Sequence, residues 1–207
     1  MTPAAERAWY DELRLLLESA YLAGDNPRAQ SGFSRDEAAW ERARRVILDA
    51  VDRDGTFLDV GCASGYLMES LVGWATAKGL HLEPYGLDFS DRLATLARSR
   101  LPQWADRIFV SNALEWRPPH RFDYVRTELV YVPEHRQREL VQRLFDDVLL
   151  PGGRLIVCSY GSSRRPQPNA EPLGELLRGW GHEVKGEAAA REINGRVVTY
   201  VAWIDRW

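Results

Sequence analysis

The sequence predicts a doubly wound α/β fold with a mainly parallel sheet, and two observations support this prediction. Short apolar segments alternate with segments of helical periodicity from about residue 51 to the carboxyl terminus. The first two apolar segments, 57–60 and 82–89, each carry an acid near their end, Asp59 and Asp88. Because ligands of open α/β sheets bind at the carboxyl ends of the strands, we expect a binding site beside these acids.

A tight turn of small residues joins the first apolar segment to the helical pattern that begins at Leu67. Gly61 and Gly65 let the backbone reverse without placing a side chain in the way of a ligand. The following helix would offer unpaired N–H groups at its start. A dinucleotide fingerprint would need two further glycines where Ala63 and Tyr66 stand, so the spacing disfavours a dinucleotide site.

Two stretches carry a resemblance to a known family. Residues 57–65 read Phe-Leu-Asp-Val-Gly-Cys-Ala-Ser-Gly. They resemble motif I of the class I S-adenosylmethionine-dependent methyltransferases, with Ala63 in place of a glycine and Ser64 in place of a threonine. Residues 149–155, Leu-Leu-Pro-Gly-Gly-Arg-Leu, resemble the turn that precedes strand five in that family. The resemblance covers roughly residues 50–207.

The resemblance implies a seven-stranded sheet whose terminal strand runs antiparallel, and S-adenosylmethionine as the cofactor. It places Asp88 on the ribose hydroxyls, since carboxylates at this position accept such hydrogen bonds. It places Asn112 and Leu114 beside the adenine. The cofactor-binding residues that it implies are Asp59, Gly61, Cys62, Ala63, Ser64, Gly65, Asp88, Phe89, Asn112, Ala113, Leu114 and Glu128.

The first fifty residues lie outside the shared core. Their pattern predicts an amphipathic helix over 6–23, a turn-rich segment over 24–34 and a second helix over 35–51. Ser34 and Glu37 form a capping box for the second helix. We expect residues 1–50 to form a helical lid over a core of 51–207. Alternatively, these helices only complete the core.

Methyl transfer relies largely on positioning, and a base is needed where the acceptor is a hydroxyl or a protonated amine. Glu128 and Tyr131 follow the fourth predicted strand, 122–127, and His135 follows in the same loop. These three are the catalytic candidates, although His135 also fits an exposed residue at a helix start. The candidate substrate contacts are aromatic, namely Tyr21, Phe33, Tyr131 and Tyr160.

Composition excludes several other classes of protein. The 207 residues suit one domain, and no apolar run reaches the length of a membrane span. Cys62 and Cys158 lie in or beside apolar strands, which predicts reduced thiols, a cytoplasmic protein and no metal site.

A net charge of −3 makes nucleic acid an unlikely partner. Arginines in 42–45 and 136–143 alternate with glutamates, as on solvated helix faces. Arg164 and Arg165 lie in a predicted loop, 161–170, that is a candidate substrate loop.

These observations predict a methyltransferase that acts on an oxygen or nitrogen of a small molecule. Two alternatives stay open. One is an RNA methyltransferase that uses the arginine groups to contact phosphates. The other is a non-catalytic S-adenosylmethionine-binding protein with a regulatory role. The sequence does not identify the methyl acceptor or the oligomeric state.

Overall fold

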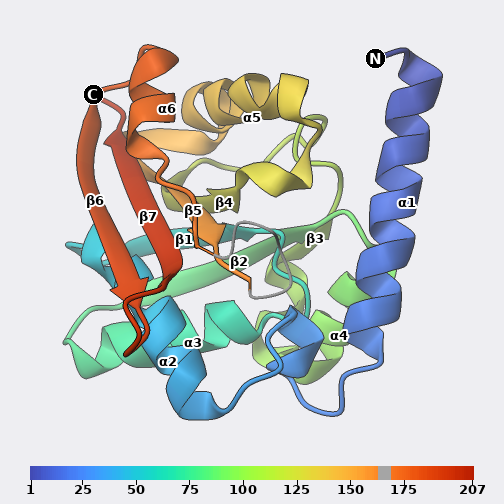
Figure 1. Ribbon diagram of the computed structural model, residues 1–207, viewed down its shortest axis with the longest axis horizontal. Helices are drawn as coiled ribbons and strands as arrows, with labels where there is room; N and C mark the ends of the chain where they lie inside the picture. Colours follow the sequence, from blue (N-terminus) through green and yellow to red (C-terminus); the bar gives the residue numbers. More distant parts are fainter. Residues whose placement is uncertain (163–168) are drawn as a thin grey trace.

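The computed structural model describes residues 1–162 and 169–207, and it shows a twisted sheet flanked by helices (Figure 1). The helices are α1 (Pro3–Leu22), α2 (Glu37–Arg44), α3 (Tyr66–Ala77), α4 (Asp91–Arg100), α5 (Gln137–Arg143) and α6 (Gly174–Gly179). The strands are β1 (Gly55–Val60), β2 (Leu82–Asp88), β3 (Ile108–Val110), β4 (Phe122–Glu128), β5 (Leu149–Tyr160), β6 (Val184–Arg191) and β7 (Val197–Asp205). Short 3₁₀ or π segments are η1 (Ala29–Ser31), η2 (Arg45–Ala50), η3 (Pro102–Arg107), η4 (Leu129–Tyr131), η5 (Glu134–Arg136) and η6 (Leu144–Val148).

The seven strands form one sheet in the order β3-β2-β1-β4-β5-β7-β6. Strands β1 to β5 pair in parallel, whereas β7 runs antiparallel to both β5 and β6. The predicted doubly wound, mainly parallel, seven-stranded sheet is therefore confirmed. Strand order reverses between β1 and β4, which is where such sheets open a crevice for ligands.

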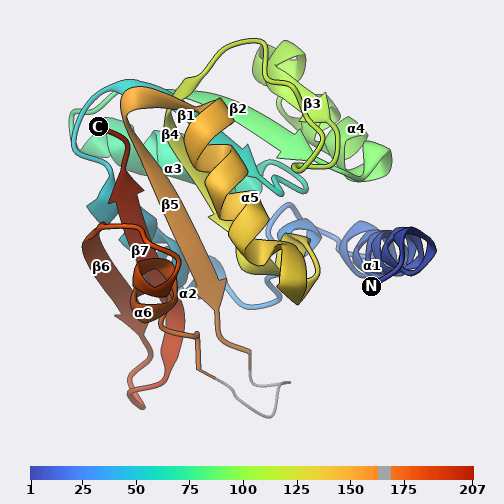
Figure 2. The ribbon, with the colours of Figure 1, turned by 90° about the horizontal axis from the view of Figure 1, so that it is seen from above.

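Helices cover both faces of the sheet (Figures 1 and 2). On one face, Leu58 of β1 and Val125 of β4 pack in a core cluster with residues of α5 and α6. On the other face, Phe57 and Tyr124 pack in a second cluster with residues of α2, η2 and α3. Successive residues of a strand point to opposite faces, so each central strand is apolar on both sides.

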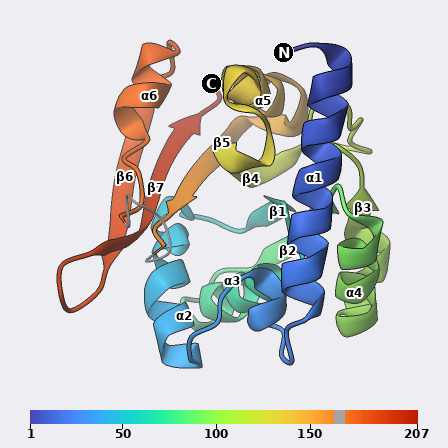
Figure 3. The ribbon, with the colours of Figure 1, turned by 45° about the vertical axis from the view of Figure 1, so that its right-hand side comes forward.

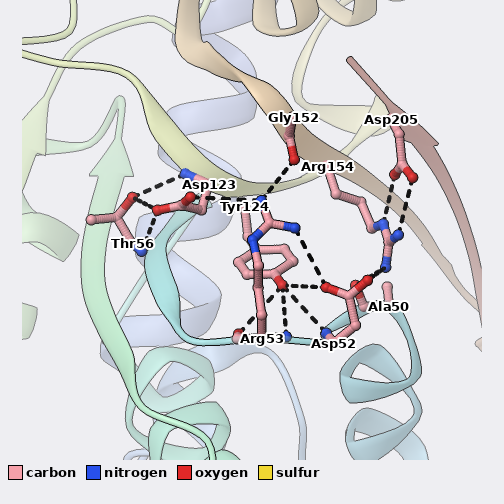
Figure 4. Close-up of polar contacts among 9 residues, drawn as sticks. All are labelled: Ala50, Asp52, Arg53, Thr56, Asp123, Tyr124, Gly152, Arg154 and Asp205. Atoms are coloured by element: carbon pink, nitrogen blue, oxygen red, sulfur yellow. Dashed lines mark hydrogen bonds and ion pairs between the residues drawn. The ribbon is translucent and has the colours of Figure 1, made fainter. Parts of the chain in front are cut away.

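A polar network fixes the end of the sheet opposite to the carboxyl ends of the parallel strands (Figure 4). The Tyr124 hydroxyl accepts hydrogen bonds from the backbone N–H groups of Asp52 and Arg53, at 3.3 and 3.1 Å, and donates to Asp52 Oδ1 at 2.7 Å. The Arg154 guanidinium makes a two-pronged contact with Asp205, at 2.6 and 3.0 Å. The Tyr124 bonds attach the link between η2 and β1 to the sheet, and the Arg154–Asp205 contact joins the neighbouring strands β5 and β7.

Helix α1 stands apart from the helices that flank the sheet (Figures 2 and 3). Its attachment to the core includes Glu18, whose Oε1 accepts a hydrogen bond of 2.6 Å from Ser90 Oγ at the start of α4. The following segment rests on the turn after β1, because Ser64 Oγ contacts Ser31 Oγ at 2.7 Å and donates to the Pro27 carbonyl at 2.9 Å. The N-terminal segment thus lies over the turn of small residues.

The predicted second helix is corrected in two respects. Asp36, and not Ser34, is its N-cap, because Asp36 Oδ1 accepts a hydrogen bond of 2.8 Å from the Ala39 N–H. The helix does not continue to residue 51, since α2 ends at Arg44 and a 3₁₀ segment follows. Ile47 and Leu48 of that segment are fully buried in the core, so this part of the first fifty residues completes the core.

Candidate active site

A cavity of about 800 Å³ opens at the carboxyl ends of β1, β2 and β4. Its walls come from α1, the segment around residues 31–35, α2, the ends of the central strands, and the β6–β7 hairpin. Its volume lies near the upper end of the range for small-molecule sites, about 300–1,000 Å³. The cavity therefore has room for a nucleoside cofactor together with a second small molecule.

The turn between β1 and α3 forms part of the cavity wall and uses left-handed backbone at three positions. Gly61, Ala63 and Gly65 have φ angles of 80°, 47° and 74°. Ala63 is the only residue other than glycine with a positive φ in the described part of the chain. At Gly61 a Cβ would also overlap the ring of Tyr131. The glycine spacing thus reflects both backbone conformation and close packing.

Asp88 lies at the end of β2, facing this turn. Its Oδ2 accepts a hydrogen bond of 2.8 Å from the Ala63 N–H, and its Oδ1 accepts one of 2.9 Å from the Ser90 N–H. Burial raises the pKa of the Asp88 carboxyl to about 6, while these N–H groups oppose the rise. Each oxygen retains a lone pair, so the carboxylate can accept further hydrogen bonds from ligand hydroxyls.

The floor of the cavity holds an arginine that the sequence analysis assigned no role. Arg126 of β4 is 1% exposed, and its Nη1 lies 3.1 Å from Asp59 Oδ1 while its Nη2 lies 2.5 Å from Glu128 Oε1. Side chains two apart on a strand share a face, which puts Arg126 and Glu128 together. An arginine between Val125 and Thr127, inside a predicted strand, was the available signal.

Two tyrosines complete this cluster. The hydroxyls of Tyr131 and Tyr160 accept hydrogen bonds from Arg126, at 3.1 and 2.6 Å, and the Tyr131 hydroxyl donates to Glu128 Oε1 at 2.6 Å. Burial raises the pKa of both phenols, against the opposing effect of the Arg126 charge. Both hydroxyls therefore stay protonated at neutral pH.

Asp59 is fully buried at the end of β1, and burial raises the pKa of its carboxyl to about 6 in spite of Arg126. Its Oδ2 has no hydrogen-bond partner in the described structure. A buried carboxylate oxygen without a partner is costly, so this oxygen is a candidate contact for a donor on a bound ligand.

The structure divides the other predicted cofactor residues into two groups. Cys62, Phe89, Asn112 and Ala113 line the cavity together with Asp59, Gly61, Ala63, Asp88 and Glu128. Ser64, Gly65 and Leu114 are not among the lining residues. The Ser64 side chain holds the N-terminal segment, Gly65 begins α3, and Leu114 is buried in the core below the cavity.

The predicted catalytic residues are only partly brought together. Glu128 and Tyr131 lie in the cavity, but His135 does not line it. The side chain of His135 is about half exposed, and its Nε2 lies 3.9 Å from Glu6 Oε2 of α1. We therefore drop His135 as a base. The sequence of the loop that follows β4 mixes apolar and polar residues without a regular period, so it could not show which side chains point into the cavity.

All four predicted substrate residues, Tyr21, Phe33, Tyr131 and Tyr160, line the cavity. Burial, followed by the nearby charges of Glu128 and Asp88, raises the pKa of Tyr21 to about 12. Arg44, expected on a solvated face, is instead buried at 7% exposure and also lines the cavity. The predicted loop residues Arg164 and Arg165 lie outside the described residues.

The metal-ligating side chains and the two cysteines of the described part of the chain lie apart from one another or are buried. Within residues 1–162 and 169–207, no cluster of three or more histidine, cysteine or acidic side chains could hold a metal ion. Cys62 and Cys158 are free and buried, and burial raises the pKa of both thiols. Of the helices that the structure describes, none has both the length and the apolar character of a membrane span.

Solved structures with the same arrangement were found. N-methyltransferase NodS from Bradyrhizobium japonicum WM9, in complex with S-adenosyl-L-homocysteine, has a TM-score of 0.69 at 18% identity over 93% of this chain and 97% of that one. The 1,6-didemethyltoxoflavin N1-methyltransferase from Burkholderia thailandensis has a TM-score of 0.70 at 19% identity, covering 100% of this chain and 92% of that one. The fold is that of class I methyltransferases.

The sequence comparisons add nothing to this assignment. No known protein-family pattern matches the chain, and no curated protein matches it in sequence. The class I methyltransferase fold does not itself fix the reaction, since a structure described as the [4+2]-cyclase SpnF matches with a TM-score of 0.62 at 14% identity over 98% of this chain and 95% of that one. The function must therefore be argued from the site.

Proposed function

We propose that this chain is an S-adenosylmethionine-dependent methyltransferase that methylates an oxygen or nitrogen of a small molecule. The observation that carries the proposal is the position of Asp88. Its buried carboxylate faces the glycine turn at the mouth of a cavity large enough for cofactor and acceptor. We place the protein in the cytoplasm, where its two free thiols would stay reduced.

The residues at the strand ends fit this cofactor. Asp88 would accept the ribose hydroxyls, and the unpartnered Oδ2 of Asp59 would face a donor or a positive charge. The left-handed turn at 61–65 leaves open backbone next to them. When bound, the cofactor supplies an electrophilic methyl group carried on a sulfonium. Asn112, Ala113 and Phe89 would border the adenine.

Glu128 is the candidate proton acceptor, and Tyr131 the residue that orients it. Tyr131 stays protonated and its hydroxyl donates a hydrogen bond to Glu128 Oε1, while Arg126 donates to the same oxygen. The other carboxylate oxygen, Oε2, makes no hydrogen bond to the described residues and is available to an acceptor hydroxyl or ammonium. A positioned carboxylate of this kind contributes roughly 10²–10⁴-fold to a rate that needs a base.

The first part of the proposal is tested by calorimetry with S-adenosylhomocysteine. The Asp88→Ala variant should bind it about 1.5–3 kcal/mol more weakly, the scale for hydrogen bonds to a charged group. Asp91→Ala is the matched control, since Asp91 is exposed at the start of α4. Equal affinities of the parent and the Asp88 variant would show that the ribose is bound elsewhere.

The catalytic part is tested by following conversion of S-adenosylmethionine to S-adenosylhomocysteine with a panel of small acceptors. Glu128→Gln should lower turnover more than it weakens cofactor binding. Cofactor binding without turnover by any acceptor would favour the non-catalytic alternative. Product formation on RNA, with binding that weakens steeply with salt, would favour the RNA methyltransferase alternative.

The lid belongs to the same proposal. We propose that residues 1–50 act as a lid on the core of 51–207, with α1 and the segment 24–34 as its movable parts. Leu13 and Leu17 of α1 face the cavity, and Leu16 lines it while remaining 66% exposed. A weakly covered apolar wall of this kind suits a segment that closes on a ligand.

A further inference from the structure

Arg44 of α2 is a buried cation that has no anionic partner among residues 1–162 and 169–207. It is 7% exposed, yet its guanidinium forms no ion pair with any carboxylate in the described structure. Its one hydrogen bond there is a contact of 3.2 Å from Nη1 to Thr199 Oγ1. Buried charges are normally paired, and the guanidinium carries five N–H donors, so most of its hydrogen-bonding capacity is unused.

Aromatic rings surround this guanidinium. Its Cζ lies 3.5 Å from the ring centroid of Tyr160 and 5.2 Å from those of Phe33 and Trp40. Such contacts offset part of the cost of burying a cation. They also leave the edge of the guanidinium plane, where the N–H groups lie, without a carboxylate. All four side chains line the cavity.

The lack of a carboxylate partner distinguishes Arg44 from Arg126, the other buried arginine of the cavity. Both arginines contact Tyr160, Arg44 through the ring face and Arg126 through a hydrogen bond of 2.6 Å to the hydroxyl. Arg126 is paired with two carboxylates, those of Asp59 and Glu128, and its charge is thereby balanced. Arg44 has neither.

The charges of the cavity wall are also divided in space. The strand ends supply Asp59, Asp88 and Glu128, which suit a cofactor that carries hydroxyls and a positive charge. In the part of the wall formed by residues 35–44 and by the β6–β7 hairpin, the charged side chains that line the cavity are Arg35, Arg42, Arg44, Arg191, Arg196 and one acid, Glu192, which is shared between Arg35 and Arg196. This wall is therefore basic.

We propose that the methyl acceptor carries an anionic group, a carboxylate or a phosphate, which binds to the guanidinium of Arg44. The proposal rests on the function proposed above and specifies its substrate class. The rings of Phe33 and Tyr160 hold the apolar body of the acceptor, and charge-assisted N–H···O bonds from Arg44 fix its anionic end. The acceptor atom is thereby turned away from α2 and toward Glu128.

Calorimetry on the protein saturated with S-adenosylhomocysteine tests this proposal. The probes are matched pairs, namely aromatic carboxylates with their carboxamides and aryl phosphates with the corresponding phenols. At least one anionic series should bind about tenfold or more tightly than its neutral partner, the smallest effect expected for a charge-assisted bond. The carboxylate and phosphate arms show which anion the site takes.

Three variants locate the effect. Arg44→Met should abolish the preference for the anion, whereas Arg44→Lys should keep part of it because a point charge remains. Arg42→Met is the control, because Arg42 lies on the same helix and at the cavity but is exposed. It should retain the preference. Thermal unfolding and S-adenosylhomocysteine affinity, measured for every variant, show that each remains folded.

The outcomes separate this proposal from the one on which it rests. Equal binding of acids and amides to the parent protein would overturn it, as would an unchanged preference in Arg44→Met. If the parent still bound S-adenosylhomocysteine in that case, the methyltransferase proposal would stand and only the substrate class would fail. Loss of S-adenosylhomocysteine binding by the parent would remove the methyltransferase proposal itself.

Discussion

Arg126 and Asp59 face each other on the adjacent strands β4 and β1, with Nη1 and Oδ1 3.1 Å apart. They meet where the strand order reverses, so their pairing lies at the ligand crevice. Arg126 also binds Glu128, and one guanidinium therefore holds two carboxylates at the base of the cavity. The organisation of the site depends on this one side chain.

Replacing Arg126 with Met should destabilise the fold by about 3–5 kcal/mol, because the change leaves buried carboxylates without their counter-ion. Chemical denaturation at pH 7 measures this loss. Arg107→Met is the control, since it breaks the pair with Glu83 and the contact with the Tyr85 ring at the surface and should cost about 0–1 kcal/mol.

The loss of folding stability in the Arg126→Met variant, relative to the parent, should also become smaller as the pH falls. Without Arg126 the pKa of Asp59 rises further above its ordinary value, because Arg126 is what opposes the effect of burial. Protonation then removes the uncompensated charge. A deficit that stays constant between pH 7 and pH 5 would point to lost packing as its cause.

Cofactor affinity should depend on pH through Asp59 and Asp88. Burial raises both pKa values from 3.8 to about 6, so both groups take up protons as the pH falls through that value. S-adenosylmethionine should therefore bind with constant affinity above about pH 7 and progressively more weakly below pH 6. Calorimetry between pH 5 and pH 8 measures this dependence, and Asp88→Asn should flatten it while Asp91→Asn should not.

The stability of the free protein should respond to these two groups with the opposite sign. Their folded-state pKa values lie above the unfolded value, so the folded state binds more protons between pH 3.8 and about 6. Their contribution favours folding at acidic pH and is lost as the pH rises through this window. Affinity and the stability contribution of these carboxyls thus change in opposite directions.

Replacing Ala63 with Gly should leave the fold as stable as the parent or stabilise it by up to about 1 kcal/mol. A left-handed conformation costs an L-residue with a side chain roughly 1–2 kcal/mol, which exceeds the extra flexibility that glycine adds to the unfolded chain. Ala75→Gly, inside α3, is the control and should be destabilising by about 1 kcal/mol or more. A Tm that falls equally in both variants would contradict the strain at Ala63.

Amides of residues 24–34 should exchange more slowly with solvent once S-adenosylhomocysteine is bound, if this segment closes over the site. Phe33→Ala should raise the KM for an acceptor with little change in Tm, because Phe33 lines the cavity and packs edge-on against Trp40 with ring centroids 5.4 Å apart. Leu15→Ala, at an exposed position of α1, should leave KM unchanged. Identical exchange with and without ligand would mean that the segment is fixed packing.

Local signals in the sequence determined most of the elements and the residues at the strand ends that line the cavity. The turn at Gly61 and Gly65 and the acid at Asp88 could be recognised because each depends on neighbours only a few residues away. The N-cap of α4 is equally local: Ser90 Oγ accepts a hydrogen bond of 3.2 Å from the Leu93 N–H, three residues on. Alternation of apolar strands with helical patterns was enough to predict the parallel sheet.

Only the tertiary structure decided which charged side chains turn inward. Arg126 and Asp59 are 67 residues apart in the chain, and their contact depends on the register between β1 and β4. Arg44 is buried because Thr199, 155 residues away in the chain, and the ring of Tyr160 pack directly against its guanidinium. Helical periodicity alone could not distinguish Arg44 from its exposed neighbour Arg42. Whether a cation lies in water or in a pocket is fixed by segments that the chain brings together only on folding.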